Sequence, residues 1–400
     1  MRQLLNLVKQ NIFPLLLLGS IAVLLCLAVF GVGRNGGNGL DFSIMYAGGR
    51  AWLMGVNPYN QNELNQVMAG IKGLPKGALD SPFSYPPPTA AFFVPLALFS
   101  FPVANVFWIL LNLLSVAAIV TLSIYVLNQH TKGREDKVRN GIIAAFIIAN
   151  PLTTNVVWQG QTSLVVFAAT MGAWFFSRQN KWILAGICLG VATCKPQLCI
   201  LVFVWFLLER SWKIIGISLI TAGVMSIYLL VVQGPIGAIT AWLLKLQTHK
   251  NFYANVPGFE HVIGLQSLFW SAGLKIPSLE LVGIASVAIL WSFRSRINPE
   301  DIFAILMALT LLFVFLHDSE YVCLIPVFTS LWMYWYEHRK HWPGLILLLV
   351  LFIFPRRVVR TLEIPVLNQW RIVIVLIMFA LVVRLSIKYK SQLDLQKISA

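Results

Sequence analysis

Long apolar runs separated by short polar loops recur along the whole chain of 400 residues. A helix needs about 20 apolar residues to cross a hydrocarbon core about 30 Å thick. Several runs are shorter than this, so we expect some helices to be tilted, broken or enclosed by protein. The pattern predicts an all-α polytopic membrane protein with about 12 transmembrane helices. The expected spans are residues 12–32, 104–127, 141–152, 160–177, 181–194, 197–209, 211–233, 278–293, 302–317, 321–336, 342–354 and 370–388.

The composition supports a membrane protein, because 58% of the residues are hydrophobic and only 11% are charged. Soluble proteins have about 25% charged residues. A formal net charge of +15 would indicate nucleic-acid binding in a soluble protein. With the predicted spans and both termini in the cytosol, however, most of the basic loop residues fall on the cytosolic side. This is the positive-inside distribution, so we expect no nucleic-acid partner.

The longest segment between predicted spans covers residues 33–88 and falls on the outer side of the membrane. Apolar residues at helical spacing predict a helix over residues 43–54, which places Tyr46 and Arg50 one turn apart on one face. A second helix is expected near residues 63–71. Helices of this kind lie along the membrane interface, so the large first outer loop is expected to carry interfacial helices.

The stretch of residues 89–99 is too short to cross the bilayer and is expected to dip into it or lie at its surface. Residues 234–277 and 355–370 form the other sizeable outer loops. The sequence contains no evident internal repeat and no segment typical of a soluble domain. Residues 1–400 are therefore predicted to form a single transmembrane domain, with an outer catalytic loop at 33–88 and an outer basic loop at 355–370.

Asp41 follows the first predicted span and lies at the mouth of the membrane domain, away from the cytosol. One interpretation is a helix N-cap, because Asp accepts hydrogen bonds from unpaired backbone N–H groups. The other is a general base, since a partly desolvated carboxylate can take a proton from a sugar hydroxyl. The two roles are compatible.

Polar residues also occur within or between apolar runs on the outer side. The segment Trp158-Gln159-Gly160-Gln161 either offers amide groups to a sugar or forms an ordinary interfacial turn. Lys195 lies in the outer half of the membrane, where a charge costs about 2.5–3.5 kcal/mol. We expect it to have a function, the alternative being a lysine that extends to the interface.

Three arginines, Arg356, Arg357 and Arg360, lie in the outer basic loop, where the positive-inside rule does not require them. Guanidinium groups match phosphate oxygens, so we expect phosphate recognition. The alternative is that the count of spans is wrong by one.

His317 lies at the outer end of a predicted span and shares a helix face with Tyr321 if the helix continues. Asp318 and Glu320 have the D-x-E spacing of a metal-binding motif. The alternative is that Asp318 and Glu320 are ordinary hydrophilic residues at the end of a span.

Four motifs together resemble glycosyltransferase family 87. They are D-F-S-I-M-Y-A-G-G-R-A-W-L-M-G-V-N-P-Y from Asp41, F-S-Y-P-P-P-T-A from Phe83, W-Q-G-Q-T-S-L from Trp158 and A-G-I-C-L-G-V-A-T-C-K-P-Q, which ends at Gln197. The first two are fairly specific as a pair. The family includes polyprenyl-phosphomannose-dependent α-mannosyltransferases and related arabinofuranosyltransferases. The similarity covers most of residues 15–330.

The resemblance implies a GT-C fold, a lipid-phosphate sugar donor and inverting transfer without a metal or cofactor. By the same resemblance, Asp41 matches the aspartate taken as general base. His317 matches a histidine near the site in some members, and Lys195 matches a lysine that precedes proline. Asp318 and Glu320 depart from the family pattern and leave metal independence open.

These observations predict an integral-membrane hexosyltransferase of the bacterial plasma membrane, in contact with membrane lipids. It would move a hexose, with mannose expected, from a polyprenyl-phosphate sugar to a lipid- or glycan-linked acceptor at the outer face. The alternative is a transporter or flippase of lipid-linked sugars, a class that usually has inverted repeats. The candidate catalytic residues are Asp41 and His317, and the candidate substrate-binding residues are Tyr46, Arg50, Tyr85, Gln159, Gln161, Lys195, Arg356, Arg357 and Arg360.

Overall fold

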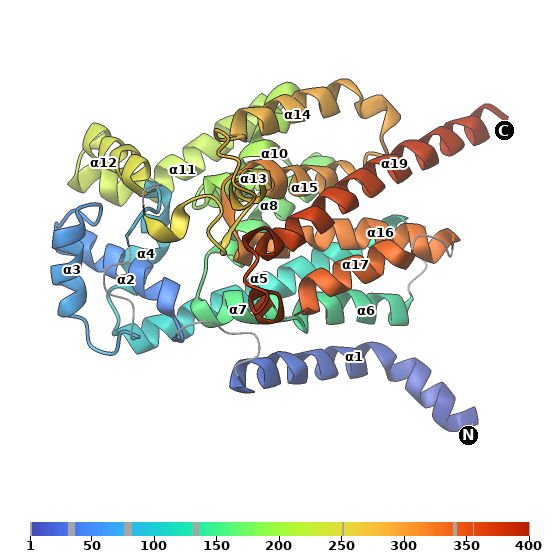
Figure 1. Cartoon of the computed structure of the whole chain (residues 1–400), viewed down its shortest axis with the longest axis horizontal. Coiled ribbons are helices and arrows are strands. Elements are labelled where there is room, and N and C mark those ends of the chain that lie inside the picture. Colours follow the sequence, from blue (N-terminus) through green and yellow to red (C-terminus); the bar gives the residue numbers. More distant parts are fainter. Residues whose placement is uncertain are drawn as a thin grey trace. The chain divides into compact units, whose positions relative to one another are not determined.

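A computed structural model describes residues 2–30, 37–75, 82–130, 136–249, 252–338, 342–354 and 356–399. These residues are almost entirely helical (Figure 1). They form two compact units. Unit 1 comprises Met1–Asn128, Lys132–Pro196 and Lys213–Phe252, and unit 2 comprises Gln129–Thr131, Gln197–Trp212 and Tyr253–Ala400.

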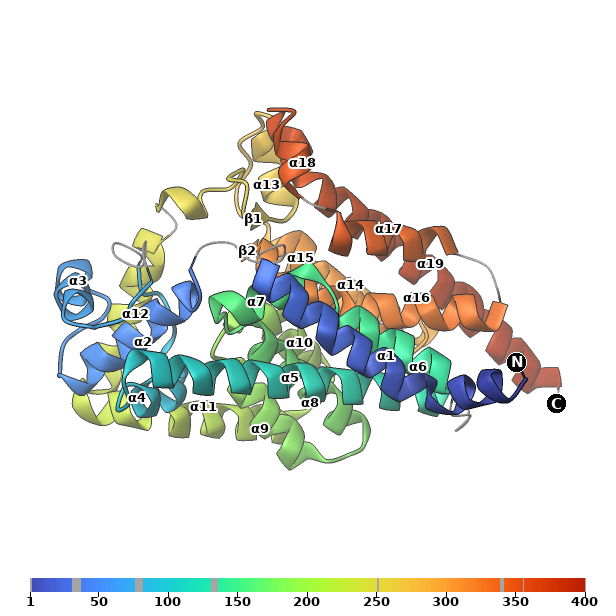
Figure 2. The same ribbon diagram turned by 90° about the horizontal axis from the view of Figure 1, so that it is seen from below.

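Unit 1 contains most of the long amino-terminal helices and the helices of the first long loop (Figure 2). Its elements are α1 (Arg2–Phe30), α2 (Leu40–Leu53), α3 (Gln61–Ala69), the 3₁₀ helix η1 (Pro87–Thr89), α4 (Ala90–Leu96), α5 (Phe101–His130), α6 (Lys137–Ile148), α7 (Pro151–Gln159), α8 (Ser163–Arg178), α9 (Trp182–Ala192), α11 (Trp212–Val232) and α12 (Pro235–His249).

Unit 2 contains the carboxy-terminal helices and one short pair of strands. Its elements are α10 (Pro196–Leu208), η2 (Tyr253–Asn255), β1 (Val262–Ile263), α13 (Leu265–Ser271), α14 (Glu280–Ser292), η3 (Arg294–Arg296), α15 (Ile302–Phe313), β2 (Leu316–His317), η4 (Asp318–Leu324), α16 (Ile325–His338), α17 (Trp342–Ile353), α18 (Arg356–Arg360), η5 (Pro365–Gln369) and α19 (Trp370–Ser399).

Four helical segments among the described residues are long and apolar enough to cross a membrane. Six further apolar helices have 10–17 residues, which is short for a hydrocarbon core about 30 Å thick. The protein is thus a helical protein with several membrane-spanning candidates, and the count of about 12 spans stays a prediction. The four long segments are Ile12–Phe30, Phe101–Gln129, Trp212–Val232 and Pro365–Gln392.

Helices α6 and α7 make one further candidate span, which is bent by 47°. The bend follows from Asn150-Pro151: the Asn150 side chain accepts a hydrogen bond from the backbone N–H of Thr153, and Pro151 occupies the first turn of α7. Proline lacks the N–H that would continue the preceding helix. The bend sets the direction of α7 and so the position of the segment that follows it.

The helices expected in the first long loop are present as α2 and α3, and their position at the membrane interface stays a prediction. Helix α2 begins at Leu40, three residues earlier than expected, because Gly39 adopts a left-handed conformation (φ 68°) and forms its N-cap. Helix α3 is preceded by Asn60, whose side chain accepts from the N–H of Asn62. The apolar stretch expected at 89–99 forms η1 and the short helix α4.

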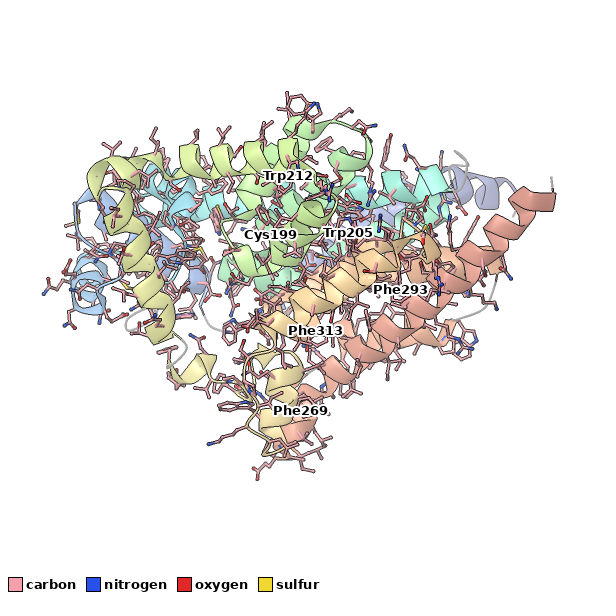
Figure 3. The ribbon with its side chains drawn as sticks, turned by 90° about the horizontal axis from the view of Figure 1, so that it is seen from above. Cys199, Trp205, Trp212, Phe269, Phe293 and Phe313 are labelled. Atoms are coloured by element: carbon pink, nitrogen blue, oxygen red, sulfur yellow. The ribbon has the colours of Figure 1, made fainter. Side chains whose placement is uncertain are left out.

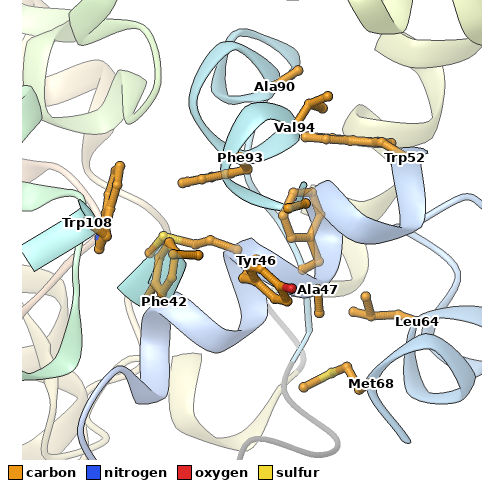
Figure 4. Packing of buried hydrophobic residues seen from close by; sticks show 14 of the residues in the cluster. Phe42, Tyr46, Ala47, Trp52, Leu64, Met68, Ala90, Phe93, Val94 and Trp108 are labelled. Carbon is orange, nitrogen blue, oxygen red and sulfur yellow. The ribbon is translucent and has the colours of Figure 1, made fainter. Parts of the chain in front are cut away.

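A cluster of buried aromatic side chains joins α2, α4 and α5 (Figure 4). Phe42 of α2 stacks on Trp108 of α5 with ring centroids 5.5 Å apart, and Phe93 of α4 meets the same indole edge-on at 5.5 Å. Aromatic pairs contribute about 0.5–1.5 kcal/mol beyond the area they bury. The amino-terminal end of α2 is therefore fixed against α5.

In unit 2, Gly283 of α14 brings that helix close to α15, since a Cβ there would lie 2.9 Å from the Cβ of Phe313 (labelled in Figure 3). After α15 ends at Phe313, the chain forms β2, which pairs antiparallel with β1 and places Val262 opposite His317. This pairing fixes the segment 253–264 beside the segment 316–324.

Candidate functional site

Asp41 and Lys195 are linked through the side-chain amide of Gln161. The Nε2 atom of Gln161 donates to Oδ2 of Asp41 at 2.6 Å, and Nζ of Lys195 lies 3.5 Å from the amide oxygen of Gln161. Nζ also donates to Oγ of Ser163 at 3.0 Å. We call these four residues the Gln161 network. They come from three separate parts of the sequence, all within unit 1.

The backbone around Gly160 brings Gln161 to the start of α2. The N–H of Gly39 donates to the carbonyl of Trp158 at 2.8 Å, and the indole N–H of Trp108 donates to the carbonyl of Gly160 at 2.6 Å. Gly160 has a φ of +72°, and a Cβ there would lie 2.6 Å from the Cβ of Phe42. Both the left-handed conformation and the close approach require glycine.

The two ends of the Gln161 amide meet partners of opposite charge. Its N–H group faces the carboxylate of Asp41 and its oxygen faces the ammonium of Lys195. Hydrogen bonds to charged groups are stronger than those between neutral groups. Because the amide has one donor end and one acceptor end, both contacts fix the same orientation of Gln161.

The N-cap of α2 is Gly39, so the prediction of an N-cap role for Asp41 is wrong. Asp41 instead lies in the first helical turn, where the positive end of the helix dipole favours a carboxylate. Lys195 is only 7% exposed. It therefore does not extend to water, and its ammonium group contacts the side-chain oxygens of Gln161 and Ser163.

Tyr46 and Arg50 tie α2 to the end of α4. The hydroxyl of Tyr46 donates to the carbonyl of Phe99 at 2.7 Å, and Nη1 of Arg50 donates to the carbonyl of Ala97 at 3.0 Å. Burial raises the pKa of the Tyr46 hydroxyl above its usual value, and the nearby charge of Arg50 acts in the opposite direction. These contacts position α4, and a role in binding substrate stays a prediction.

Tyr85 and Gln159 are both half-buried. The ring of Tyr85 packs between Phe83 and Phe93, with centroids 5.6 and 5.8 Å away. The side-chain oxygen of Gln159 accepts from Asn155 at 3.3 Å. Gln159 thus contacts its own helix, whereas Gln161, two residues later, reaches α2.

His317 lies in unit 2, in β2. The condition for a helix face shared with Tyr321 is not met, because α15 ends at Phe313 and η4 begins at Asp318. Nε2 of His317 is 3.0 Å from Oδ1 of Asn255, and its backbone N–H donates to Oε2 of Glu320 at 2.6 Å. Glu320 is fully buried and has the role of a capping residue.

Charged residues form a second cluster in unit 2, which we call the His261 network: Glu260, His261, Asp318 and Arg360. Nδ1 of His261 lies 3.0 Å from Oδ2 of Asp318, and Arg360 forms an ion pair with Glu260. Nη2 of Arg360 is also 3.4 Å from Nε2 of His261. The side chains of Arg356 and Arg357, the other predicted phosphate ligands, lie outside the described residues.

Asp318 and Glu320, which form the D-x-E pair, contact different partners. Asp318 contacts His261, while Glu320 contacts the backbone of His317 and the hydroxyl of Ser319. Within the described residues, no three His, Cys, Asp or Glu side chains come together as a metal site would require.

Ser163, Glu260 and His261 are members of these networks that the sequence analysis did not select. The position of Ser163 could have indicated its part in the network, because it lies two residues after Gln161, at the start of α8. Glu260-His261 is a polar pair within the predicted outer loop 234–277.

The model of glycosyltransferase family 87 matches residues 83–318. A mannosyltransferase of Mycolicibacterium smegmatis, described as polyprenol-phosphate-mannose-dependent and as acting α-(1-2) on phosphatidylinositol mannoside, is 29% identical over 182 residues. That alignment covers 43% of this chain and 39% of the relative. No solved structure matches.

The family match includes Gln161, Ser163, Lys195 and His317 and begins after Asp41. It covers more than half of the chain, and the apolar helices agree with a membrane enzyme. The chain therefore belongs to glycosyltransferase family 87.

Proposed function

We propose that the protein transfers a hexose from a polyprenyl-phosphate sugar to a lipid- or glycan-linked acceptor, with inversion, and that it has a GT-C fold. Mannose is the proposed sugar, since the Mycolicibacterium smegmatis relative is described as dependent on polyprenol-phosphate-mannose. The observation that carries the proposal is the Gln161 network, which holds a carboxylate and an ammonium group on either end of one amide.

In the proposed reaction, the oxygen of an acceptor hydroxyl attacks C1 of the hexose. Its proton passes to the carboxylate of Asp41, which acts as general base. The bond between C1 and the phosphate oxygen breaks, and polyprenyl phosphate leaves with the electron pair. Attack and departure on opposite faces of C1 give inversion.

Lys195 has two proposed roles in this reaction. Its ammonium group stabilises the negative charge that develops on the departing phosphate. Through Gln161 it also orients Asp41, because the amide can satisfy both groups in one orientation only. Arg360 is a less suitable phosphate ligand, since it already pairs with Glu260. Arg356, Arg357 and His317 remain candidates on sequence grounds.

The direct test uses purified protein, radiolabelled polyprenyl-phosphomannose and a lipid extract. We expect a labelled glycolipid to form and the anomeric configuration of the transferred sugar to be inverted. A donor that crosses a vesicle membrane without being consumed would instead support the transporter alternative. Label that appears with retained configuration would exclude the proposed single displacement.

We further propose that the site faces the outer side of a bacterial plasma membrane. The test is labelling of single cysteines at Asn62 and Lys137, both exposed, in a protein without other cysteines. A membrane-impermeant thiol reagent should label Asn62→Cys from outside and Lys137→Cys only after the membrane is opened. Labelling of both from one side would overturn this orientation.

A further inference from the structure

A groove lies between the segment that follows α2 and helix α12, both in unit 1. Its volume is about 320 Å³. We call it the α12 groove. Figures 1 and 2 show α12 beside α2 and α3, at the end of unit 1 where α5 begins and α11 ends. Asn57, Tyr59 and Asn60 line one side, and Leu244, Lys245 and Thr248 line the other.

Lys245 gives the groove a positive charge. Its Nζ donates to the amide oxygen of Gln61 at 3.2 Å, and it has no carboxylate partner among the described residues. The side chain is half-buried, and this burial lowers the pKa of its ammonium group. A partly desolvated charge without a counter-ion is unfavourable, so an anion in the groove would stabilise it.

Asn57 adds a hydrogen-bond donor. Its side-chain oxygen accepts from the N–H of Tyr59 at 3.0 Å, and its backbone N–H donates to Glu63 at 3.2 Å. Among the described residues, its side-chain NH₂ group has no partner. The carboxylate of Glu63 is also bound by Asn60 at 2.6 Å and does not line the groove.

The same helix exposes an apolar face. Ile236, Ile239 and Leu243 lie at helical spacing and are 80%, 46% and 49% exposed, and Leu244 beside the groove is 58% exposed. Helix α12 begins three residues after α11, a candidate span whose last turn exposes 78% of Val231. An exposed apolar face that continues from a span is expected to contact acyl chains.

These observations favour an anionic lipid over a soluble anion. We propose that the α12 groove binds the phosphate headgroup of the acceptor, a phospholipid-anchored glycan, with its acyl chains along the apolar face of α12. The assignment to the acceptor rests on the proposed function. The donor phosphate must lie next to the reacting carbon. Asp41 lies in the first turn of α2, whose remaining length to Leu53 is about 18 Å at 1.5 Å per residue, and the groove residues Asn57, Tyr59 and Asn60 follow the far end of that helix.

This separation also limits the acceptor. A molecule whose phosphate occupies the groove and whose hydroxyl reaches Asp41 must extend about as far as α2 does. A single sugar on a phospholipid is too short for this. The expected acceptor is therefore a phospholipid that already carries several sugars.

The first experiment measures lipid binding and does not depend on transfer. Native mass spectrometry of the protein in detergent would give apparent Kd values for phosphatidylglycerol, phosphatidylcholine and inorganic phosphate. We expect phosphatidylglycerol to bind most tightly. Lys245→Gln should weaken it about tenfold, the effect of losing one hydrogen bond to a charged group, and Lys245→Arg should restore it. Lys72→Gln, which removes an exposed lysine that does not line the groove, is the matched control.

Equal Kd values for wild type, Lys245→Gln and Lys72→Gln would overturn the groove as an anion site. Inorganic phosphate bound as tightly as phosphatidylglycerol would overturn the lipid assignment. The second experiment measures transfer to the glycolipid identified in the extract. Lys245→Gln should raise the acceptor KM about tenfold and leave kcat and donor KM unchanged. An unchanged acceptor KM together with weakened lipid binding would show that the bound lipid is not the acceptor.

Discussion

The Gln161 network in unit 1 and the His261 network in unit 2 use the same kinds of charged groups in opposite ways. In unit 2, Arg360 and Glu260 form a direct ion pair, and His261 contacts the carboxylate of Asp318. In unit 1, a neutral amide lies between the carboxylate of Asp41 and the ammonium of Lys195. The first arrangement uses charge to join loops, whereas the second orients two charged groups through a shared neighbour.

The difference has a chemical consequence. Direct ion pairing lowers both the basicity of a carboxylate and the charge that a cation offers to a substrate. The amide of Gln161 contacts both charged groups and fixes their positions relative to each other. We therefore expect substitutions in the Gln161 network to affect catalysis and substitutions in the His261 network to affect stability.

The largest difference in activity is expected between two Asp→Asn substitutions, one in each network. Asp41→Asn keeps the size of the side chain and removes the proton acceptor, and a general base contributes about 10²–10⁴-fold. Transfer should fall at least a hundredfold, while Asp318→Asn should keep activity within a few-fold of wild type. Steady-state transfer rates at matched expression and unfolding temperature would measure both. Comparable losses in the two variants would remove the functional distinction between the networks.

An intermediate effect is expected from Gln161→Ala and Lys195→Ala. Each removes at least one hydrogen bond to a charged group, worth about 1.5–3 kcal/mol, so kcat/KM should fall about tenfold or more. If Lys195 orients Asp41 through Gln161, the fall in kcat/KM of the double variant should be smaller than the two single falls combined. Strictly additive losses would mean that Lys195 acts on the donor phosphate alone.

The smallest effect is expected for the Arg360–Glu260 pair, whose side chains are 37% and 30% exposed. Exposed pairs contribute about 0.2–1 kcal/mol. A double-mutant cycle of Arg360→Ala and Glu260→Ala, followed by thermal unfolding, should give a coupling energy in that range with donor KM unchanged. A donor KM that rises in Arg360→Ala and not in Glu260→Ala would indicate that Arg360 binds the donor phosphate.

Periodicity and hydropathy predicted much of the fold. Helices α2 and α3 follow apolar spacing within a polar loop, and their existence was predicted, although the start of α2 was misplaced by three residues. That error arose at Gly39, whose left-handed conformation forms the N-cap. The N–H of Gly39 also donates to the carbonyl of Trp158, a contact that the local sequence does not encode.

The sequence predicted residues of the candidate site but not the contacts between them. Asp41, Gln161 and Lys195 each stood out as a polar residue beside apolar runs. The sequence did not reveal that Gln161 contacts Asp41 directly, because the two are separated by 120 positions and meet through the aromatic packing of Phe42 and Trp108. Hydropathy predicted a span over residues 302–317, but α15 ends at Phe313 and Leu316–His317 form β2, which pairs with β1.

The contact between Asp41 and Gln161 also constrains biogenesis. After Asp41 the ribosome must add 120 residues to reach Gln161 before the two side chains can meet, which takes about 6–24 s at about 5–20 residues per second. Until then α2 lacks the contacts that orient Asp41. A nascent chain released before Gln161 is added would therefore carry the carboxylate without the amide that positions it, and we expect such a fragment to be inactive.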